Sequence, residues 1–166
     1  MSSNAPVASV VIALADEAAT ERVAAAVAAV LSPPARVFLS GELGVGKTTL
    51  VRGLLRGLGH TGRVRSPTFT LLEPYNLPSL SVYHFDFYRF STQDAWREAG
   101  FDEYFGGPGV CLVEWPELAG PGLPRPDLWI HLRFGAAPSD EGARVARLDA
   151  YSEAGLRCLN AAAAAC

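Results

Sequence analysis

Cysteine and surplus positive charge are both scarce in this chain of 166 residues. The cysteines number three, Cys111, Cys158 and Cys166, an odd count without the spacing of a disulfide framework, so we expect a reducing compartment. Lysine and arginine total 14 against 17 aspartate and glutamate residues, which gives a net charge of −3. This balance argues against a protein that binds nucleic acid alone through a basic face, but it leaves contact through a partner open.

Long hydrophobic runs are also missing. No apolar run approaches the ~18 residues that a membrane span needs. The N-terminal segment MSSNAPVASV lacks the basic and apolar regions of a signal peptide, so we expect a cytoplasmic protein. Because the length suits one folded unit, we predict a single domain over residues 1–160 and a disordered alanine-rich tail over 161–166.

Strands interleaved with helices are typical of an α/β domain. A hairpin after the second helix is expected to add antiparallel pairs to a sheet that is otherwise parallel. The run VCLVE, which ends at Glu114, has no polar residue before its end and suits a strand buried on both faces. The sequence predicts strands at residues 7–14, 35–40, 65–75, 81–90, 109–115, 127–134 and 143–151, and helices at 17–31, 48–58, 92–99, 101–105 and 152–160.

A glycine-rich loop separates the strand at residues 35–40 from the next helix. It reads GELGVGKT and matches the pattern G-x-x-x-x-G-K-[ST] with Gly41, Gly46, Lys47 and Thr48. Glycines let the backbone curl so that successive N–H groups point at phosphate oxygens, and the following helix adds its positive end. Lys47 would reach the β- and γ-phosphates, and the Thr48 hydroxyl would bind the accompanying Mg²⁺. The sequence therefore predicts a P-loop nucleotide-binding domain.

The phosphate cradle would consist of main-chain N–H groups. A glycine-rich turn that binds nothing is the alternative, but the strand before the loop and the helix after it argue against that interpretation. The loop contacts phosphates only, so it does not distinguish ATP from GTP. The residues that would form the cradle are Gly44, Val45, Gly46, Lys47, Thr48 and Thr49.

Hydrolysis or transfer also requires one group that holds the metal ion and another that orients the nucleophile. Glu114 closes an apolar strand, where many P-loop proteins place a metal-side aspartate; a solvated charge at a strand end is the alternative. Asp86 lies between Phe85 and Phe87, so alternation turns its side chain away from both rings, to the face that His84 shares. Asp86 is the second candidate for the metal-side carboxylate; alternatively, it faces water in the hairpin or pairs with Arg89.

The segment SPTFT supplies two further candidates, about twenty residues after Lys47. In many GTPases a threonine in a loop after the first helix senses the γ-phosphate, and Thr68 beside Ser66 would suit this role. Alternatively, Pro67 fixes a turn in which Ser66 or Thr68 bonds to the backbone. The residues alone leave both interpretations open.

Several motifs coincide in order along the chain. They are GELGVGKTTLVRGLLRGLGH, VRSPTFTLLEPY, VYHFDFYR, GFDEYF and VCLVEWPE, and together they closely resemble the bacterial TsaE (YjeE) family from about Ala15 to Leu132. Members of that family are small P-loop ATPases needed to make N6-threonylcarbamoyladenosine in tRNA. The resemblance implies a P-loop NTPase-like α/β sheet flanked by helices, with ATP or ADP and Mg²⁺ as its ligands.

The resemblance also implies roles for single residues, carried over position by position. The matching positions are Lys47, Asp86 and Glu114 for catalysis, Thr48 and Glu114 for the metal ion, Trp115 and Glu17 beside the nucleotide, and Ser66 and Thr68 in a switch-like loop. Such proteins work with TsaB and TsaD. The implied activity is an ATPase that is weak alone and activated by the TsaB–TsaD pair, with tRNA contacted only indirectly.

Two other functions stay open. A small-molecule P-loop kinase usually closes an arginine-rich lid over the phosphates, and the sequence has no convincing lid of this kind. A nucleotide-gated interaction protein, in which hydrolysis is incidental, would use SPTFT as its switch and the aromatic residues of HFDFYRF as part of a docking face.

Overall fold

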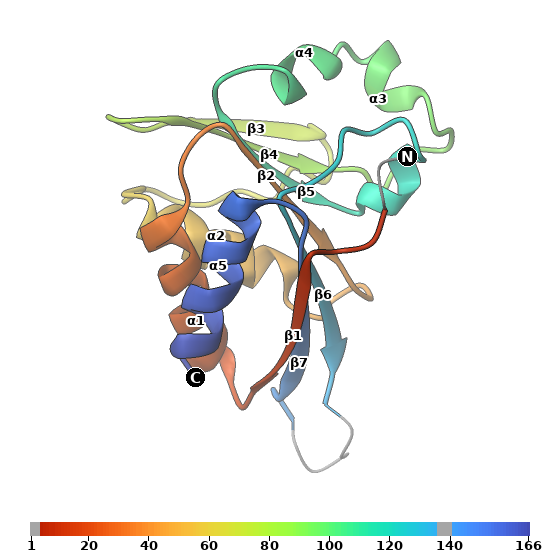
Figure 1. The fold of residues 1–166 in the computed structure, drawn as a ribbon. Coiled ribbons are helices and arrows are strands. Elements are labelled where there is room, and N and C mark those ends of the chain that lie inside the picture. The colour runs from red at the N-terminus through yellow and green to blue at the C-terminus, as the bar shows by residue number, and fades with distance from the viewer. Residues whose placement is uncertain (1–3, 136–140) are drawn as a thin grey trace.

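The computed structural model describes residues 4–135 and 141–166, which form one sheet with helices on both of its faces (Figure 1). The strands are β1 (Ala8–Leu14), β2 (Ala35–Ser40), β3 (Leu72–Asn76), β4 (Ser81–Asp86), β5 (Val110–Glu114), β6 (Leu128–Phe134) and β7 (Arg144–Ala150). The helices are α1 (Glu17–Val30), α2 (Lys47–Gly57), α3 (Ala95–Glu98), α4 (Asp102–Phe105), the 3₁₀ helix η1 (Pro116–Ala119) and α5 (Glu153–Ala164).

The sheet is mixed, with the strand order β1-β7-β6-β2-β5-β4-β3. Its centre is parallel, because β2 pairs in parallel with β5 and β6, and β4 pairs in parallel with β5. Both edges are antiparallel, through the β3–β4 hairpin on one side and β6, β7 and β1 on the other. The α/β fold with a mixed sheet and a hairpin after the P-loop helix, expected from the sequence, is confirmed.

Strand β5 is buried on both faces, as its uninterrupted apolar sequence predicts. Val110 and Leu112 belong to the core between the sheet and helices α1, α2 and α5, whereas Cys111 and Val113 belong to a second, aromatic core under α3, α4 and η1. This position in the centre of the sheet, between β2 and β4, determines where the charged residue at its end, Glu114, can lie.

Helix α2 lies unusually close to α1 because small residues face each other. A Cβ atom added at Gly53 would lie 2.6 Å from Cβ of Ala24, and one added at Gly57 would lie 2.6 Å from Cβ of Ala28. Real Cβ atoms do not approach this closely, so the contact requires glycine at these two positions of α2. The crossing sets the position of the whole helix whose first turn carries Lys47.

Several segments differ from the expectation, and the strand expected at 81–90 already ends at Asp86. The alanine-rich end continues helix α5 to Ala164, instead of forming the expected disordered tail over 161–166, because alanine favours helix strongly and Ala162 is buried against the core. Extended structure in the hairpin begins only at Leu72, since the preceding SPTFT residues form a loop closed by the bond from Leu71 N–H to Pro67 O (2.6 Å). The helix expected at 92–99 is a single turn, Ala95–Glu98.

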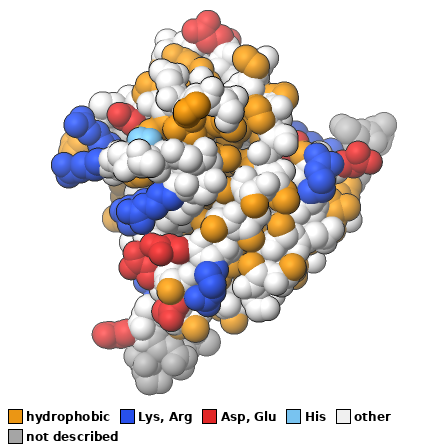
Figure 2. Space-filling model, turned by 90° about the vertical axis from the view of Figure 1, so that its left-hand side faces the viewer, with side chains coloured by type: hydrophobic (Ala, Val, Ile, Leu, Met, Phe, Trp, Pro, Cys, Tyr) orange, Lys and Arg blue, Asp and Glu red, His pale blue; other side chains and the backbone are white. Residues whose placement is uncertain are grey.

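Figure 2 shows the side that lies to the left in Figure 1. Blue Lys and Arg side chains and red Asp and Glu side chains lie near one another toward its margins, and its centre is largely uncharged. Among the described residues, no helix is long and apolar enough to cross a membrane.

The close crossing of α1 and α2 predicts that Gly53→Ala lowers the free energy of unfolding by about 1–3 kcal/mol, the usual cost of overpacking, despite alanine's better helix propensity. Urea denaturation should also show coupling with Ala24→Gly, which removes the opposing methyl group. The double variant is expected to be more stable than the sum of the two single changes by about 1 kcal/mol or more. Additive effects would mean that the helices separate freely.

Candidate functional site

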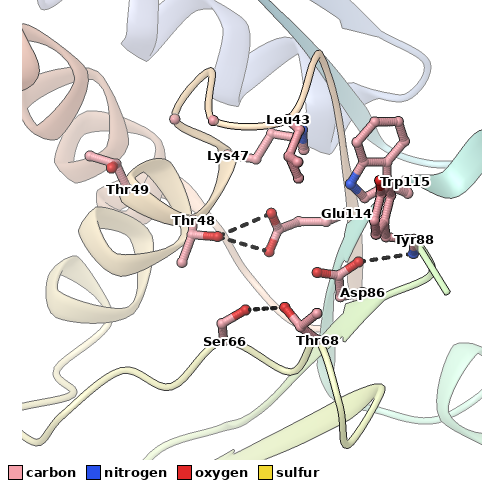
Figure 3. Close-up of a pocket in the computed structure, with 12 residues that line it drawn as sticks. Leu43, Lys47, Thr48, Thr49, Ser66, Thr68, Asp86, Tyr88, Glu114 and Trp115 are labelled. Atoms are coloured by element: carbon pink, nitrogen blue, oxygen red, sulfur yellow. Dashed lines mark hydrogen bonds between the residues drawn. The ribbon is translucent and has the colours of Figure 1, made fainter.

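The carboxyl ends of three neighbouring parallel strands meet at one edge of the sheet. β2 leads into the P-loop, β4 ends at Asp86 and β5 ends at Glu114. In the strand register Glu114 pairs with Leu39 on one side and with Asp86 on the other. A cavity of about 460 Å³ opens at this edge (Figure 3), and it is lined by Leu43, Gly44, Gly46, Lys47, Thr48, Thr49, Ser66, Thr68, Asp86, Tyr88, Glu114 and Trp115.

The P-loop backbone provides a cradle that side chains would fill. Gly44 and Gly46 have positive φ angles of 80° and 115°, and a Cβ atom added at either would enter open space. Gly46 is also the N-cap of α2, and no side chain caps the first N–H groups of that helix. Uncapped N–H groups at a helix N-terminus favour an anion, so the backbone fits phosphate oxygens.

Lys47 is the cation of the cavity, and it is only 4% exposed. Its ammonium donates to the carbonyl oxygens of Gly41 and Glu42 (3.0 Å to the latter) and lies 4.3 Å from the ring centroid of Trp115. Burial lowers the pKa of Lys47, and the nearby carboxylates, led by Glu114, act in the opposite direction. An anionic ligand would add further negative charge beside a lysine that burial has stripped of water.

Thr48 and Glu114 form the oxygen pair at the centre of the cavity (Figure 3). The Thr48 hydroxyl lies 3.2 Å from Oε1 and 3.4 Å from Oε2 of Glu114, which is 2% exposed. The second carboxylate oxygen also lies 2.6 Å from Nε2 of His84. The carboxylate is therefore held from two directions.

The donor set suits Mg²⁺ rather than a metal held by protein alone. Among the described residues no group of three or more His, Cys, Asp or Glu side chains could hold a metal ion. Mg²⁺ is commonly bound by one or two protein oxygens, several waters and substrate phosphates. One hydroxyl and one carboxylate beside a phosphate cradle fit that pattern.

Asp86 points into the same cavity from the end of β4 (Figure 3). Its Oδ1 accepts the N–H of Tyr88 at 2.9 Å, and the residue is 7% exposed. Burial raises the pKa of Asp86 above its ordinary value. The Tyr88 hydrogen bond opposes this rise, while the Glu114 charge reinforces it.

Ser66 and Thr68 lie across the cavity from the P-loop, and their hydroxyl oxygens are 2.7 Å apart. Pro67 between them is buried, whereas Phe69 is 81% exposed. The structure therefore brings both predicted switch residues to the cavity. Their hydroxyls bond to each other, and the turn that follows is closed by main-chain atoms, from Leu71 N–H to Pro67 O.

Trp115 reaches the cavity through an unusual backbone conformation. Its φ angle is 59°, which a bulky residue adopts rarely, and Pro116 follows it. This turn places the indole against Lys47 and 5.0 Å from the ring of Tyr88. Strained backbone of this kind tends to occur at functional sites, where the surrounding structure enforces it.

Glu17 and Val45 are predicted residues that do not line the first cavity. Both line a second cavity of about 160 Å³, which shares Gly44, Gly46 and Thr49 with the first. Glu17 is the first residue of α1, whose N-cap Asp16 accepts the N–H of Ala19 at 2.8 Å. Glu17 therefore lines a different cavity from Glu114.

Several residues that line these cavities or contact their lining were not among the predicted site residues. Tyr88 and Leu43 line the first cavity, Arg144 lines the second and donates to Val45 O at 2.8 Å, and His84 bonds to Glu114. Alternation along HFDFYR already placed His84 on the face of Asp86, but not in contact with Glu114. No local sequence signal indicates Arg144, because its contact spans 99 residues.

Comparisons with known proteins give a consistent result. The family model described as "Threonylcarbamoyl adenosine biosynthesis protein TsaE" matches residues 14–141. A protein named tRNA threonylcarbamoyladenosine biosynthesis protein TsaE from Bacillus subtilis is 45% identical over 114 residues, 69% of this chain and 71% of that protein. The protein of the same name from Haemophilus influenzae is 44% identical over 98 residues. That match covers 59% of this chain and 62% of the relative, less than two thirds of its length.

A solved structure is similar over nearly the whole chain. The crystal structure of Bacillus subtilis YdiB has a TM-score of 0.78 and 31% sequence identity, and the match covers 95% of each chain. The likeness includes the mixed sheet and the helices that flank it, in agreement with the fold predicted from the sequence.

The buried carboxyl of Asp86 predicts a pH-dependent gain in stability for Asp86→Asn. Because folding raises this pKa, the folded state binds the proton more tightly than the unfolded state, and stability falls as the pH rises from the unfolded value of 3.8 through the folded value. Asparagine removes that penalty and its Oδ1 can still accept the Tyr88 N–H. Without nucleotide and with EDTA, Asp86→Asn should raise the melting temperature at pH 8.

The gain in melting temperature should become smaller as the pH is lowered through the range in which the Asp86 carboxyl takes up its proton. Glu103→Gln, at an exposed position in α4, is the matched control and should not change the melting temperature in this way. An equal or lower melting temperature for Asp86→Asn at pH 8 would contradict the inferred cost of the buried charge.

Proposed function

The chain belongs to the TsaE family of threonylcarbamoyl adenosine biosynthesis proteins, and we propose that it is an ATP-hydrolysing accessory subunit of the machinery that makes N6-threonylcarbamoyladenosine in tRNA. Its proposed ligands are ATP or ADP with Mg²⁺, and its proposed partner is the TsaB–TsaD pair, with tRNA contacted only indirectly. One observation carries the ATPase proposal: the phosphate cradle, the Thr48–Glu114 pair and Asp86 converge on one cavity.

The P-loop residues bind and orient the nucleotide. Main-chain N–H groups of residues 44–49 hold the phosphates, and Lys47 offsets the charge that develops on the γ-phosphate. Lys47 exchanges its bonds to main-chain carbonyls for stronger, charge-assisted bonds to phosphate. Thr48 and Glu114 would hold the metal ion. Bound Mg²⁺ would supply neutralisation of phosphate charge.

Asp86 acts on the water molecule that attacks the γ-phosphate. Its carboxylate orients the water or accepts the proton that the water loses as its oxygen bonds to the γ-phosphorus and the bond to ADP breaks. A carboxylate with a raised pKa is a better proton acceptor than an ordinary one, since its basicity lies closer to the working pH. Trp115 and Tyr88 cover the polar groups on one side and limit the access of bulk water.

Weak activity of the isolated protein follows from the charges at the cavity. Among the described residues that line it, Lys47 is the one cation and none is arginine. Phosphoryl transfer commonly gains about 10³–10⁵-fold from an arginine supplied in the same chain or by a partner. The same lining disfavours a small-molecule kinase with an arginine-rich lid. We therefore propose that the partner supplies either charge or order.

ATP hydrolysis should accordingly depend on the partner. With a cognate TsaB–TsaD pair, turnover is expected to rise at least about tenfold above the sum of the separate activities, on the scale that added charge or order gives. Lys47→Ala should abolish the increase. ATP turnover that does not change when the TsaB–TsaD pair is added would contradict the accessory role. Phosphate transfer to an added small acceptor would instead support the kinase.

The variant Glu114→Gln distinguishes an ATPase from a nucleotide-gated interaction protein. The amide keeps the shape of the side chain but loses the charge at the metal, so we expect turnover to fall about 10²–10³-fold, while nucleotide affinity falls less. Isothermal titration and a phosphate-release assay measure the two effects. If tRNA modification by the assembled proteins survives with hydrolysis lost, the chain acts as a nucleotide-gated interaction protein.

A further inference from the structure

His84 is a fully buried side chain with one polar partner. It is 0% exposed, and its Nε2 lies 2.6 Å from Oε2 of Glu114. Its other ring nitrogen, Nδ1, is buried and has no hydrogen-bond partner among the described residues. An unpaired buried nitrogen costs stability, so packing alone would favour an apolar side chain at this position.

The surroundings of the His84 ring also indicate that packing alone would favour an apolar side chain. Along β4, Val82, His84 and Asp86 share the face opposite Phe85. Val82 is part of the apolar core beneath α1 and α2, and Asp86 lines the cavity. His84 lies between them, at the point where the apolar core meets the charged groups. It does not itself line the cavity, so its effect must pass through Glu114.

We propose that His84 is a positioning residue that orients the Glu114 carboxylate for the metal ion, an inference that rests on the proposed nucleotide function. A contact of 2.6 Å to a carboxylate requires a proton between the two atoms, so Nε2–H donates to Oε2. This bond fixes the plane of the carboxylate and leaves Oε1 nearest the Thr48 hydroxyl, at 3.2 Å. Partners of this kind, behind a metal ligand, commonly change metal affinity by about 10–100-fold.

The alternative is that His84 only fills space in the core. Both interpretations predict some loss of stability when the ring is removed, so stability cannot separate them. They differ in the response to Mg²⁺, because only the positioning role couples His84 to the carboxylate that would hold the metal ion.

The experiment compares nucleotide binding with Mg²⁺ and with EDTA. The probe is a fluorescent ADP analogue, and the variants are His84→Leu, which loses the donor, and His84→Gln, which retains an N–H donor. Val82→Ala is the matched control, since it removes buried volume from the same strand and face without contact to Glu114. In the wild-type protein, Mg²⁺ should tighten binding.

His84→Leu should raise the Mg²⁺ concentration needed for half of this effect by about 10-fold or more, while affinity in EDTA changes less than about twofold. His84→Gln should recover part of the loss, and Val82→Ala should match the wild type. An unchanged Mg²⁺ response in His84→Leu would overturn the proposal even if the wild-type protein binds and hydrolyses ATP as proposed.

A second measurement needs neither nucleotide nor metal. The chain has three histidines, so ¹⁵N-edited NMR can resolve their tautomers, with His84→Leu identifying the relevant signals. We expect His84 to carry its proton on Nε2, protected from exchange with water, and Glu114→Gln to shift that signal. A proton on Nδ1 instead would overturn the proposal, whatever the outcome for ATP hydrolysis.

Discussion

The parallel pairing of β5 with both β2 and β4 is the constraint on which the site depends. Parallel neighbours bring their carboxyl ends to the same edge, so the P-loop, Glu114 and Asp86 meet although they are distant in sequence. Because side chains alternate, a one-residue slip of β5 would turn Glu114 into the aromatic core and Val113 toward the cavity. The apolar packing on both faces of β5 therefore also fixes the chemistry at its end.

The same edge concentrates the features that cost stability. Lys47, Asp86 and Glu114 are charged groups with little exposure, His84 leaves one nitrogen unpaired, and Trp115 has a positive φ angle. Away from this edge, the buried Asp149 is paired with Arg147 and accepts the Ser9 hydroxyl, and the helix caps Asp16 and Ser152 are satisfied. A protein tolerates such local costs where binding or chemistry needs them and offsets them by packing elsewhere.

The local parts of this arrangement could be predicted from the sequence, because each has a short-range cause. Glycine spacing identified the loop, an unbroken apolar run identified β5, and alternation around Asp86 separated its carboxylate from the flanking rings. The contacts of His84 with Glu114 and of Arg144 with Val45 depend on strand order and register, which no local pattern records. The extent of α5 was missed for a different reason, since a repetitive alanine run becomes ordered only when one of its faces finds a core.

The two carboxylates of the site, Glu114 and Asp86, differ in how tightly they are held, and this difference suits them to different tasks. Glu114 is held by a hydroxyl on one side and an imidazole on the other, so it has little freedom to move. Asp86 accepts one N–H group, that of Tyr88, and lines the same cavity. A fixed carboxylate suits a metal ion, whose ligands must keep their geometry, whereas a less constrained carboxylate with a raised pKa suits a mobile water and its proton. Bound phosphates would add negative charge near both groups, and this charge would raise the pKa of Asp86 further, while Glu114 would lie beside the charge of Mg²⁺. Nucleotide binding would therefore sharpen a difference between the two carboxylates that the fold has already established.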